Sequence, residues 1–241
     1  MKSGTGDGMI REEYIARMLT GYSLVRVLSE KNGCRVLQLR HKQQQKDLVL
    51  RSFEQPVGAY ECLRCFACEN LPLIYDVIAV DDGQIVLEEY IEGLTVTQVM
   101  ESGRYRYDGA KKVMQGVLNG LHWLHQQNLV HRDVKPDNVI ITKEGRVVLI
   151  DLNASRKMSN ASRDTVIMGT VGYASPEQLG LSQSDFRTDL YAAGVLLNVM
   201  ITGKHPSQKM AKGKVGRIVR KCTEVNPDRR YDSAQQLAAA L

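Results

Sequence analysis

Residues 131–141 read His-Arg-Asp-Val-Lys-Pro-Asp-Asn-Val-Ile-Ile, a polar loop that runs directly into an apolar strand. The loop presents a carboxylate at Asp133, an ammonium at Lys135 and an amide at Asn138. Transfer of a phosphoryl group needs such groups in one small volume, because the reaction depends on alignment and on neutralising charge. A second apolar strand, residues 146–150, ends in another carboxylate, Asp151. The whole pattern is far more specific than the tripeptide His-Arg-Asp alone.

Further motifs follow this loop in a recognisable order. Asp-Leu-Asn occupies 151–153, Gly-Thr-Val-Gly-Tyr-Ala-Ser-Pro-Glu occupies 169–177, and Asn-Pro-Asp-Arg-Arg-Tyr occupies 226–231. Together with the loop they resemble the eukaryotic-type (Hanks-type) Ser/Thr protein kinases, over roughly residues 20 to 241. The resemblance implies an α+β, two-lobed fold, with a small antiparallel β N-lobe and a mainly helical C-lobe. Within this family, the chain most resembles a small, bacterial-like member whose N-lobe is degenerate.

The domain organisation follows from this resemblance. We expect a leader and a short helix over residues 1–20, the N-lobe over 21–91 and the C-lobe over 92–241, which together make a single kinase domain. At 241 residues the chain is short for a two-lobed kinase, so some elements must be trimmed.

Composition is that of a soluble globular protein, with 43% hydrophobic and 24% charged residues. The net charge of +5 is mild, and we expect no nucleic-acid partner. The N-terminus lacks the apolar region of a signal peptide, and no apolar run is long enough to span a bilayer. Five cysteines, three of them clustered, disfavour a disulfide framework and favour a reducing compartment, so we predict a cytoplasmic protein.

The resemblance assigns a role to each polar residue of the loop. Asp133 would orient the attacking hydroxyl and accept its proton, and Lys135 would neutralise charge on the transferred phosphate. Asn138 and Asp151 would hold Mg²⁺, a cation that prefers oxygen ligands. Thr170 would brace Asp133 and Lys135. A polar turn without chemistry is the alternative for this set.

Lysine at position 135 marks the Ser/Thr class of kinases rather than the tyrosine class. The expected reaction is transfer of the ATP γ-phosphate to Ser or Thr hydroxyls of protein substrates, with autophosphorylation. The resemblance also places seven residues at the nucleotide: Val36, Val49, Arg51, Glu88, Glu89, Ile91 and Ile140. The carbonyl of Glu89 and the N–H of Ile91 would pair with adenine.

The N-terminal part departs from the family pattern in two places. The three glycine positions of the phosphate loop hold Ser29, Lys31 and Cys34, and the only glycine, Gly33, is out of step. An ordinary hairpin turn is therefore as well supported as a working phosphate loop. The usual lysine of the third strand is replaced by Arg51.

The usual carboxylate partner of that cation falls on Ala59. A long side chain without a partner loses binding energy to its rotamer entropy. We therefore predict that Arg51 is held by Glu88, which is favoured because its strand is fixed, or by Glu61 if the preceding helix is rotated. In the alternative, Arg51 points to solvent and the chain is a pseudokinase that serves as a nucleotide-binding or interaction scaffold.

A small-molecule kinase of related fold is the third hypothesis. The segment 170–177 and Arg230 argue against it, because they resemble the link between the activation segment and the C-terminal helices. We accordingly predict an ion pair between Glu177 and Arg230.

Hydrophobic periodicity predicts the main elements. Helices are expected over 10–19, 56–68, 97–101, 107–126 and 187–203, and three antiparallel strands over 24–28, 35–39 and 47–51. Cys62, Cys65 and Cys68 would pack on one side of the second of these helices, which we favour over a metal site because no fourth ligand is near.

Two polar segments carry open alternatives. Residues 154–168 suit a mobile activation loop, whose phosphorylated Ser159, Ser162 or Thr165 would pair with Arg132; an inert surface loop is the alternative. Residues 203–221 contain seven basic residues and no acidic one. They suit a docking face for an acidic substrate or for anionic lipid, or, more commonly, a solvated helix face.

Overall fold

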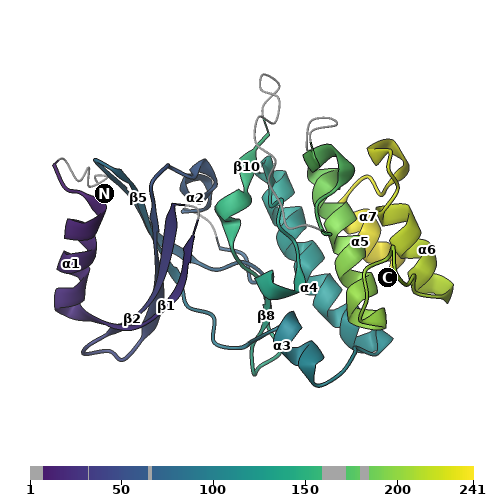
Figure 1. Ribbon diagram of the computed structural model, residues 1–241, viewed down its shortest axis with the longest axis horizontal. Coiled ribbons are helices and arrows are strands. Elements are labelled where there is room, and N and C mark those ends of the chain that lie inside the picture. The colour runs from purple at the N-terminus through teal and green to yellow at the C-terminus, as the bar shows by residue number, and fades with distance from the viewer. Residues whose placement is uncertain (1–7, 32, 65–66, 159–171, 180–184) are drawn as a thin grey trace. The chain divides into compact units, whose positions relative to one another are not determined.

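The computed structural model describes residues 8–31, 33–64, 67–158, 172–179 and 185–241 (Figure 1). The chain divides into two compact units. The first comprises Met1–Ala67 and Pro72–Tyr90, and the second comprises Cys68–Leu71 and Ile91–Leu241. Strands dominate the described part of the first unit and helices that of the second, which confirms the predicted α+β fold.

The first unit is built on a five-stranded antiparallel sheet in the order β1-β2-β3-β5-β4. Its strands are β1 (Tyr22–Lys31), β2 (Cys34–His41), β3 (Asp47–Phe53), β4 (Ile74–Val80) and β5 (Gly83–Glu89). The three predicted strands are confirmed. Between β1 and β2 the pairing of Lys31 with Cys34 closes a tight hairpin, in which Gly33 has φ +69°.

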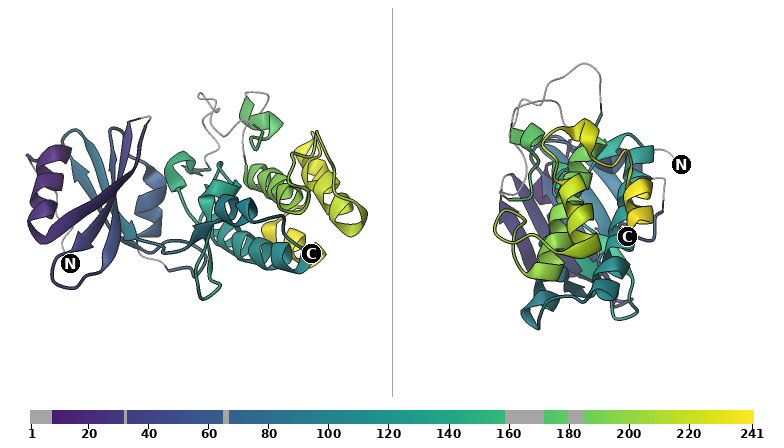
Figure 2. Two further views of the ribbon diagram at one scale, coloured as in Figure 1. Left: turned by 60° about the horizontal axis from the view of Figure 1, so that its bottom comes forward. Right: turned by 90° about the vertical axis from the view of Figure 1, so that its right-hand side faces the viewer.

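Helix α1 (Arg11–Gly21) covers one face of this sheet, as the two views of the purple helix show (Figures 1 and 2). Ile15, on its inner side, is 4% exposed. The apolar side chains of the sheet that pack in the same core are Leu37, Leu39, Leu48, Leu50, Ile78 and Ile85. Both ends of α1 are tied down, because Arg11 pairs with Asp82 and Lys42 donates to the carbonyls of Leu19 and Thr20. The predicted N-terminal helix is therefore confirmed and belongs to the core.

Helix α2 (Gly58–Leu63) is much shorter than the helix predicted over 56–68. The chain leaves the helix because the next described segment is held in the second unit. There Asn70 donates to the carbonyl of Val147 at 2.7 Å and accepts from Asn119 at 2.6 Å. The prediction of one helical stripe of cysteines is also wrong, since Cys68 lies beyond the end of α2; Cys65 lies outside the described residues.

The second unit contains the helices α3 (Val96–Glu101), α4 (Tyr107–Gln126), α5 (Phe186–Thr202), α6 (Gly213–Cys222) and α7 (Ala234–Ala240). Short strands β6 (Leu94–Thr95), β8 (Val139–Ile141) and β9 (Val147–Leu149) form one sheet, and β7 (Leu129–Val130) pairs with β10 (Arg156–Lys157). Helix α4 has the bounds predicted for it.

Local sequence explains how these helices begin and end. The side chain of Thr95 caps α3 by accepting from the N–H of Gln98, and Asp185 caps α5 in the same way. Helix α5 ends at Gly203, whose φ of +71° is a left-handed conformation that glycine adopts without strain. In the part of the chain that the structure describes, no helix is both long and apolar enough to cross a membrane.

Candidate active site

The predicted catalytic loop connects β7 to β8 and contains the short 3₁₀ helix η1 (Pro136–Asn138). Its three key side chains are in direct contact. The ammonium of Lys135 donates to Oδ2 of Asp133 at 2.7 Å. The amide of Asn138 donates to the same oxygen at 2.9 Å and to the carbonyl of Asp133 at 2.8 Å. Asp133 is therefore fixed by two donors that come from within five residues of it.

A buried carboxylate anchors the loop from behind. Asp189, in the first turn of α5, is 0% exposed and accepts the backbone N–H of His131 at 2.9 Å and that of Arg132 at 2.8 Å. Nε2 of His125 lies 2.8 Å from Oδ2 of Asp189, the same oxygen that accepts the N–H of His131. Arg132 has φ +69°, a strained conformation for a residue with a side chain, and these bonds hold it.

The charge of Asp189 is stabilised by its surroundings. Burial alone would raise the pKa of Asp189, but the hydrogen bond from His125 and those from the loop outweigh it and hold the pKa below its ordinary value. Sequence reasoning missed this anchoring role. The available signal was an aspartate in the first turn of a helix that is otherwise mostly apolar.

Asp151 follows β9 and opens the 3₁₀ helix η2 (Leu152–Ala154), with φ +68°. The residue before it ties this turn to the catalytic loop, because the N–H of Ile150 donates to the carbonyl of Asn138 at 2.8 Å. A ring nitrogen of His131 lies 3.1 Å from the carbonyl of Ile150. The strand end that carries Asp151 is thus bonded directly to the loop that carries Asp133.

The donor set of this region fits a hard divalent cation. The amide nitrogen of Asn138 is used by Asp133, which leaves its Oδ1 as the atom suited to a metal, and the carboxylate of Asp151 supplies further oxygen donors. Within the described ranges no group of three or more His, Cys, Asp or Glu residues could hold a metal by itself. A metal bound here would be held by the amide and carboxylate pair.

The first unit contains the predicted cation. Nε of Arg51 donates to Oε1 of Glu88 at 2.7 Å, and the two side chains are 7% and 4% exposed. Register explains the contact: Arg51 lies opposite Val86 and Glu88 lies opposite Val49, so the two charged residues share one face of the sheet on a diagonal. The predicted pair is confirmed, and the alternative that Arg51 points to solvent is wrong.

The other candidate partner does not hold this cation. Glu61 is exposed on α2, whereas Ala59 is 1% exposed in its core-facing position. Val36 and Val49 lie on the same sheet face as Arg51 and are 6% exposed each.

The remaining predicted nucleotide residues lie in different places. Glu89 ends β5, where its carboxylate accepts the N–H of Leu73 at 3.1 Å. Ile91, 7% exposed, and Ile140, half-buried on β8, belong to the second unit. Thr170 and the three hydroxyl residues of the predicted activation loop lie outside the described residues.

The predicted pair between Glu177 and Arg230 is also confirmed. Two parallel hydrogen bonds, of 2.6 and 2.8 Å, join the guanidinium to both carboxylate oxygens, and the side chains are 3% and 0% exposed. Thr188 of α5 donates to the same carboxylate at 3.0 Å. Burial would raise the pKa of Glu177, but the bonds from Arg230 outweigh it and lower that pKa.

Comparison with known proteins agrees with this geometry. The chain is 29% identical over 80% of its length to a probable serine/threonine-protein kinase of Clostridium perfringens. It is 27% identical over 71% to serine/threonine-protein kinase PrkC of Bacillus subtilis, and 39% identical over 52% to serine/threonine-protein kinase PknL of Mycobacterium tuberculosis. It spans about a third of the length of these relatives, from 31% to 33%. The model of the protein kinase domain family matches residues 24–239, so the chain belongs to that family.

Proposed function

We propose that this chain transfers the γ-phosphoryl group of ATP to Ser or Thr hydroxyls of proteins, itself included. The observation that carries the proposal is the bonded set of Asp133, Lys135 and Asn138. The relatives' names, all of them serine/threonine kinases, support the acceptor class.

Each residue has a task in this reaction. Asp133 aligns the attacking hydroxyl and accepts its proton as the bond to phosphorus forms. Lys135, beside it, offsets the negative charge of the transferred group. Asn138 and Asp151 would hold Mg²⁺, which when bound would neutralise charge on the phosphates. Arg51 supplies the fork that suits two phosphate oxygens, and Glu88 fixes its rotamer.

The compartment is part of the proposal. The four cysteines that the structure describes, Cys34, Cys62, Cys68 and Cys222, are not in disulfide bonds. This supports a reducing environment, the cytoplasm.

The proposal is tested by replacing Asp133 with Asn. We expect phosphate transfer from labelled ATP to fall by several orders of magnitude, because an essential orienting base is removed while the shape of the side chain is kept. Asp137→Asn is the matched control, since Asp137 is exposed in the same turn and should leave the rate unchanged. Thermal unfolding checks that both variants fold. Equal transfer by Asp133→Asn and the unaltered chain would refute the assignment.

A further inference from the structure

The solvent-facing side of α6 is made of cations. Its apolar residues Val215, Ile218, Val219 and Cys222 are buried, and α5 packs against it. Apart from a glycine at its start, every exposed residue of the helix is basic. These residues are Lys214, Arg217, Arg220 and Lys221, and the exposed Lys204, Lys209 and Lys212 precede them; we call the seven together the basic face.

The basic face accounts for the positive charge of the whole chain. The chain has 32 basic and 27 acidic residues. When the seven cations of the basic face are set aside, 25 basic and 27 acidic residues remain, and the rest of the chain is slightly acidic. Ordinary surfaces interleave the two signs, so this segregation singles out α6 and the segment that leads into it.

Holding these cations together costs free energy. Arg217 is three residues from Lys214 and from Arg220, and four from Lys221, and like charges at these spacings destabilise a helix by about 0.2–0.5 kcal/mol each. Lys214 donates to the carbonyl of Leu241 and Lys221 lies over the ring of Tyr231. Neither contact involves an acidic side chain, and no ion pair with Asp or Glu involves the basic face among the residues the structure describes.

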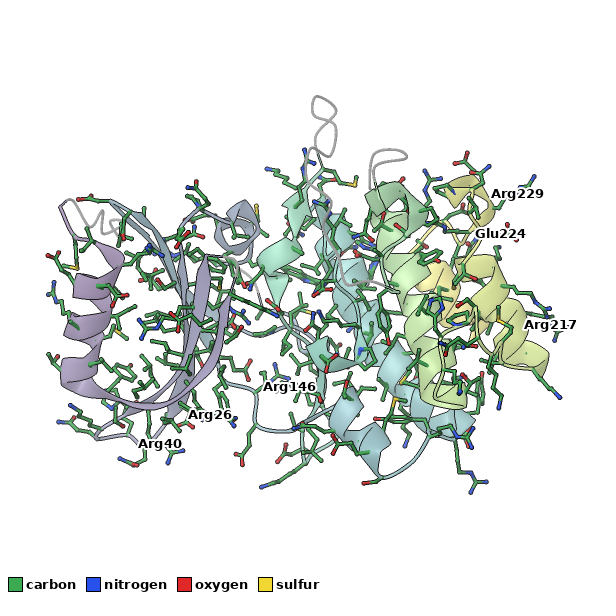
Figure 3. All side chains as sticks on the ribbon, in the orientation of Figure 1. Arg26, Arg40, Arg146, Arg217, Glu224 and Arg229 are labelled. Carbon is green, nitrogen blue, oxygen red and sulfur yellow. The ribbon has the colours of Figure 1, made fainter. Side chains whose placement is uncertain are left out.

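Arg217 and Arg220 are the cations best placed to meet a partner. Figure 3 shows Arg217 extending outward from α6, apart from Glu224 and Arg229. Glu224 is the first acidic residue after the run. Neither Arg217 nor Arg220 makes a hydrogen bond or an ion pair within the described part of the chain, so their donors face water.

We infer that the basic face docks an acidic segment of a protein substrate, an inference that rests on the proposed function. The row from Lys214 through Arg217 to Lys221 is about 10 Å long at 1.5 Å per residue. An extended peptide covers that distance in about four residues at roughly 3.3 Å each, so a short run of Glu or Asp could meet all three cations.

The chemistry favours a peptide over a membrane surface. A helix that binds a bilayer inserts apolar side chains, and those of α6 are already buried in the core of its own unit. Carboxylates, in contrast, form bidentate bonds with exposed guanidinium groups such as those of Arg217 and Arg220.

The test measures binding without catalysis. A fluorescent peptide that carries a run of Glu and no hydroxyl acceptor is titrated with the whole chain, and anisotropy is recorded. We expect Arg217→Glu with Arg220→Glu to weaken binding about tenfold or more, and the Lys replacements at both positions to retain most of it. Binding by the unaltered chain should also fall steeply between about 0.1 M and about 1 M salt.

The matched control replaces Lys112 and Lys143 by Glu. Both residues are exposed in the same unit, and the change in charge is identical, from +5 to +1. It should leave peptide affinity within about twofold, because the effect depends on place and not on net charge. Equal losses in the two double variants would overturn the inference.

Two further arms make every result decisive. The same peptide with Gln for Glu should not bind, and comparable binding of it overturns the inference. Tighter binding to vesicles that contain phosphatidylserine than to the Glu peptide, lost in Arg217→Glu with Arg220→Glu, also overturns it in favour of a membrane surface. Failure of the Asp133→Asn prediction would refute the proposed function and leave these binding results intact.

Discussion

Arg51 and Glu88 form an ion pair whose partners are both almost completely buried. Removing one partner of such a pair leaves an uncompensated charge in the core, which costs about 3–5 kcal/mol. We expect Arg51→Ala and Glu88→Ala each to lower the free energy of unfolding by about that amount, and the double variant by less than the sum. Urea unfolding of the four chains measures this cycle.

The same pair separates stability from nucleotide binding. Arg51→Met with Glu88→Leu replaces the two charges by apolar groups of similar size, and we expect it to recover most of the stability. The affinity of this variant for ATP should nevertheless be lower than that of the unaltered chain, because the cation is gone. If nucleotide affinity returned together with stability, Arg51 would have no part in binding phosphate.

Sequence reasoning at the scale of single residues succeeded where chemistry is local. Asp133, Lys135 and Asn138 lie within six positions of each other, so their contact follows from the loop itself. It missed Asp189, which reaches the loop across 57 positions through backbone N–H groups that carry no signature in the sequence.

At the scale of elements, Glu177 and Arg230 join the short 3₁₀ helix η3 (Pro176–Leu179) to the segment before α7. Because the pKa of Glu177 is lowered, its contribution to stability is complete above its ordinary value of about 4.3 and is lost as pH falls through the lowered value. We therefore expect the stability difference between the unaltered chain and Glu177→Gln to be large near neutral pH and to shrink in strong acid. Urea unfolding across this range tests it; a difference that stayed constant would contradict the sign.

Helix α1 offers a second prediction at this scale. Ile15→Asp places a charge against the apolar sheet core, and we expect it to cost about 3 kcal/mol or more. The neighbouring Ala16 is exposed, so Ala16→Asp should change the free energy of unfolding by no more than about 0.5 kcal/mol. It introduces the same residue type into the same helix and therefore controls for helix propensity. Denaturant midpoints of the two variants give the comparison, and equal losses would mean that α1 does not pack on the sheet.

Element boundaries were predictable where periodicity was strong and unopposed. Helix α4 carries an apolar stripe along its whole length and has the predicted bounds. The predicted end of helix α2 is wrong because Asn70 and Arg146 hold the following segment in the second unit. Arg146 donates to the carbonyls of Glu69 and Leu71. Such tertiary hydrogen bonds override a local periodic pattern, and they cannot be predicted from the local sequence.

At the scale of the whole molecule, the basic face and the proposed catalytic residues come from separate parts of the sequence. The residues that we propose for phosphoryl transfer and metal binding in the second unit come from positions 133–151, while the basic face comes from positions 204–221. The order of motifs predicted the family, since it depends on chemistry that many chains share. The segregated charge lies outside those motifs, and its meaning required knowing which side of α6 faces water.

The covering of the sheet by α1 bears on how this protein is handled in the laboratory. A gene fragment trimmed to the family match would begin at residue 24 and encode neither α1 nor its tether at Arg11. The face formed by residues such as Leu37, Leu50 and Ile85 would then meet solvent, and an apolar surface of that kind drives aggregation. Poor recovery of such a fragment would reflect a missing lid on the sheet rather than an inactive enzyme, so expression should start no later than residue 8.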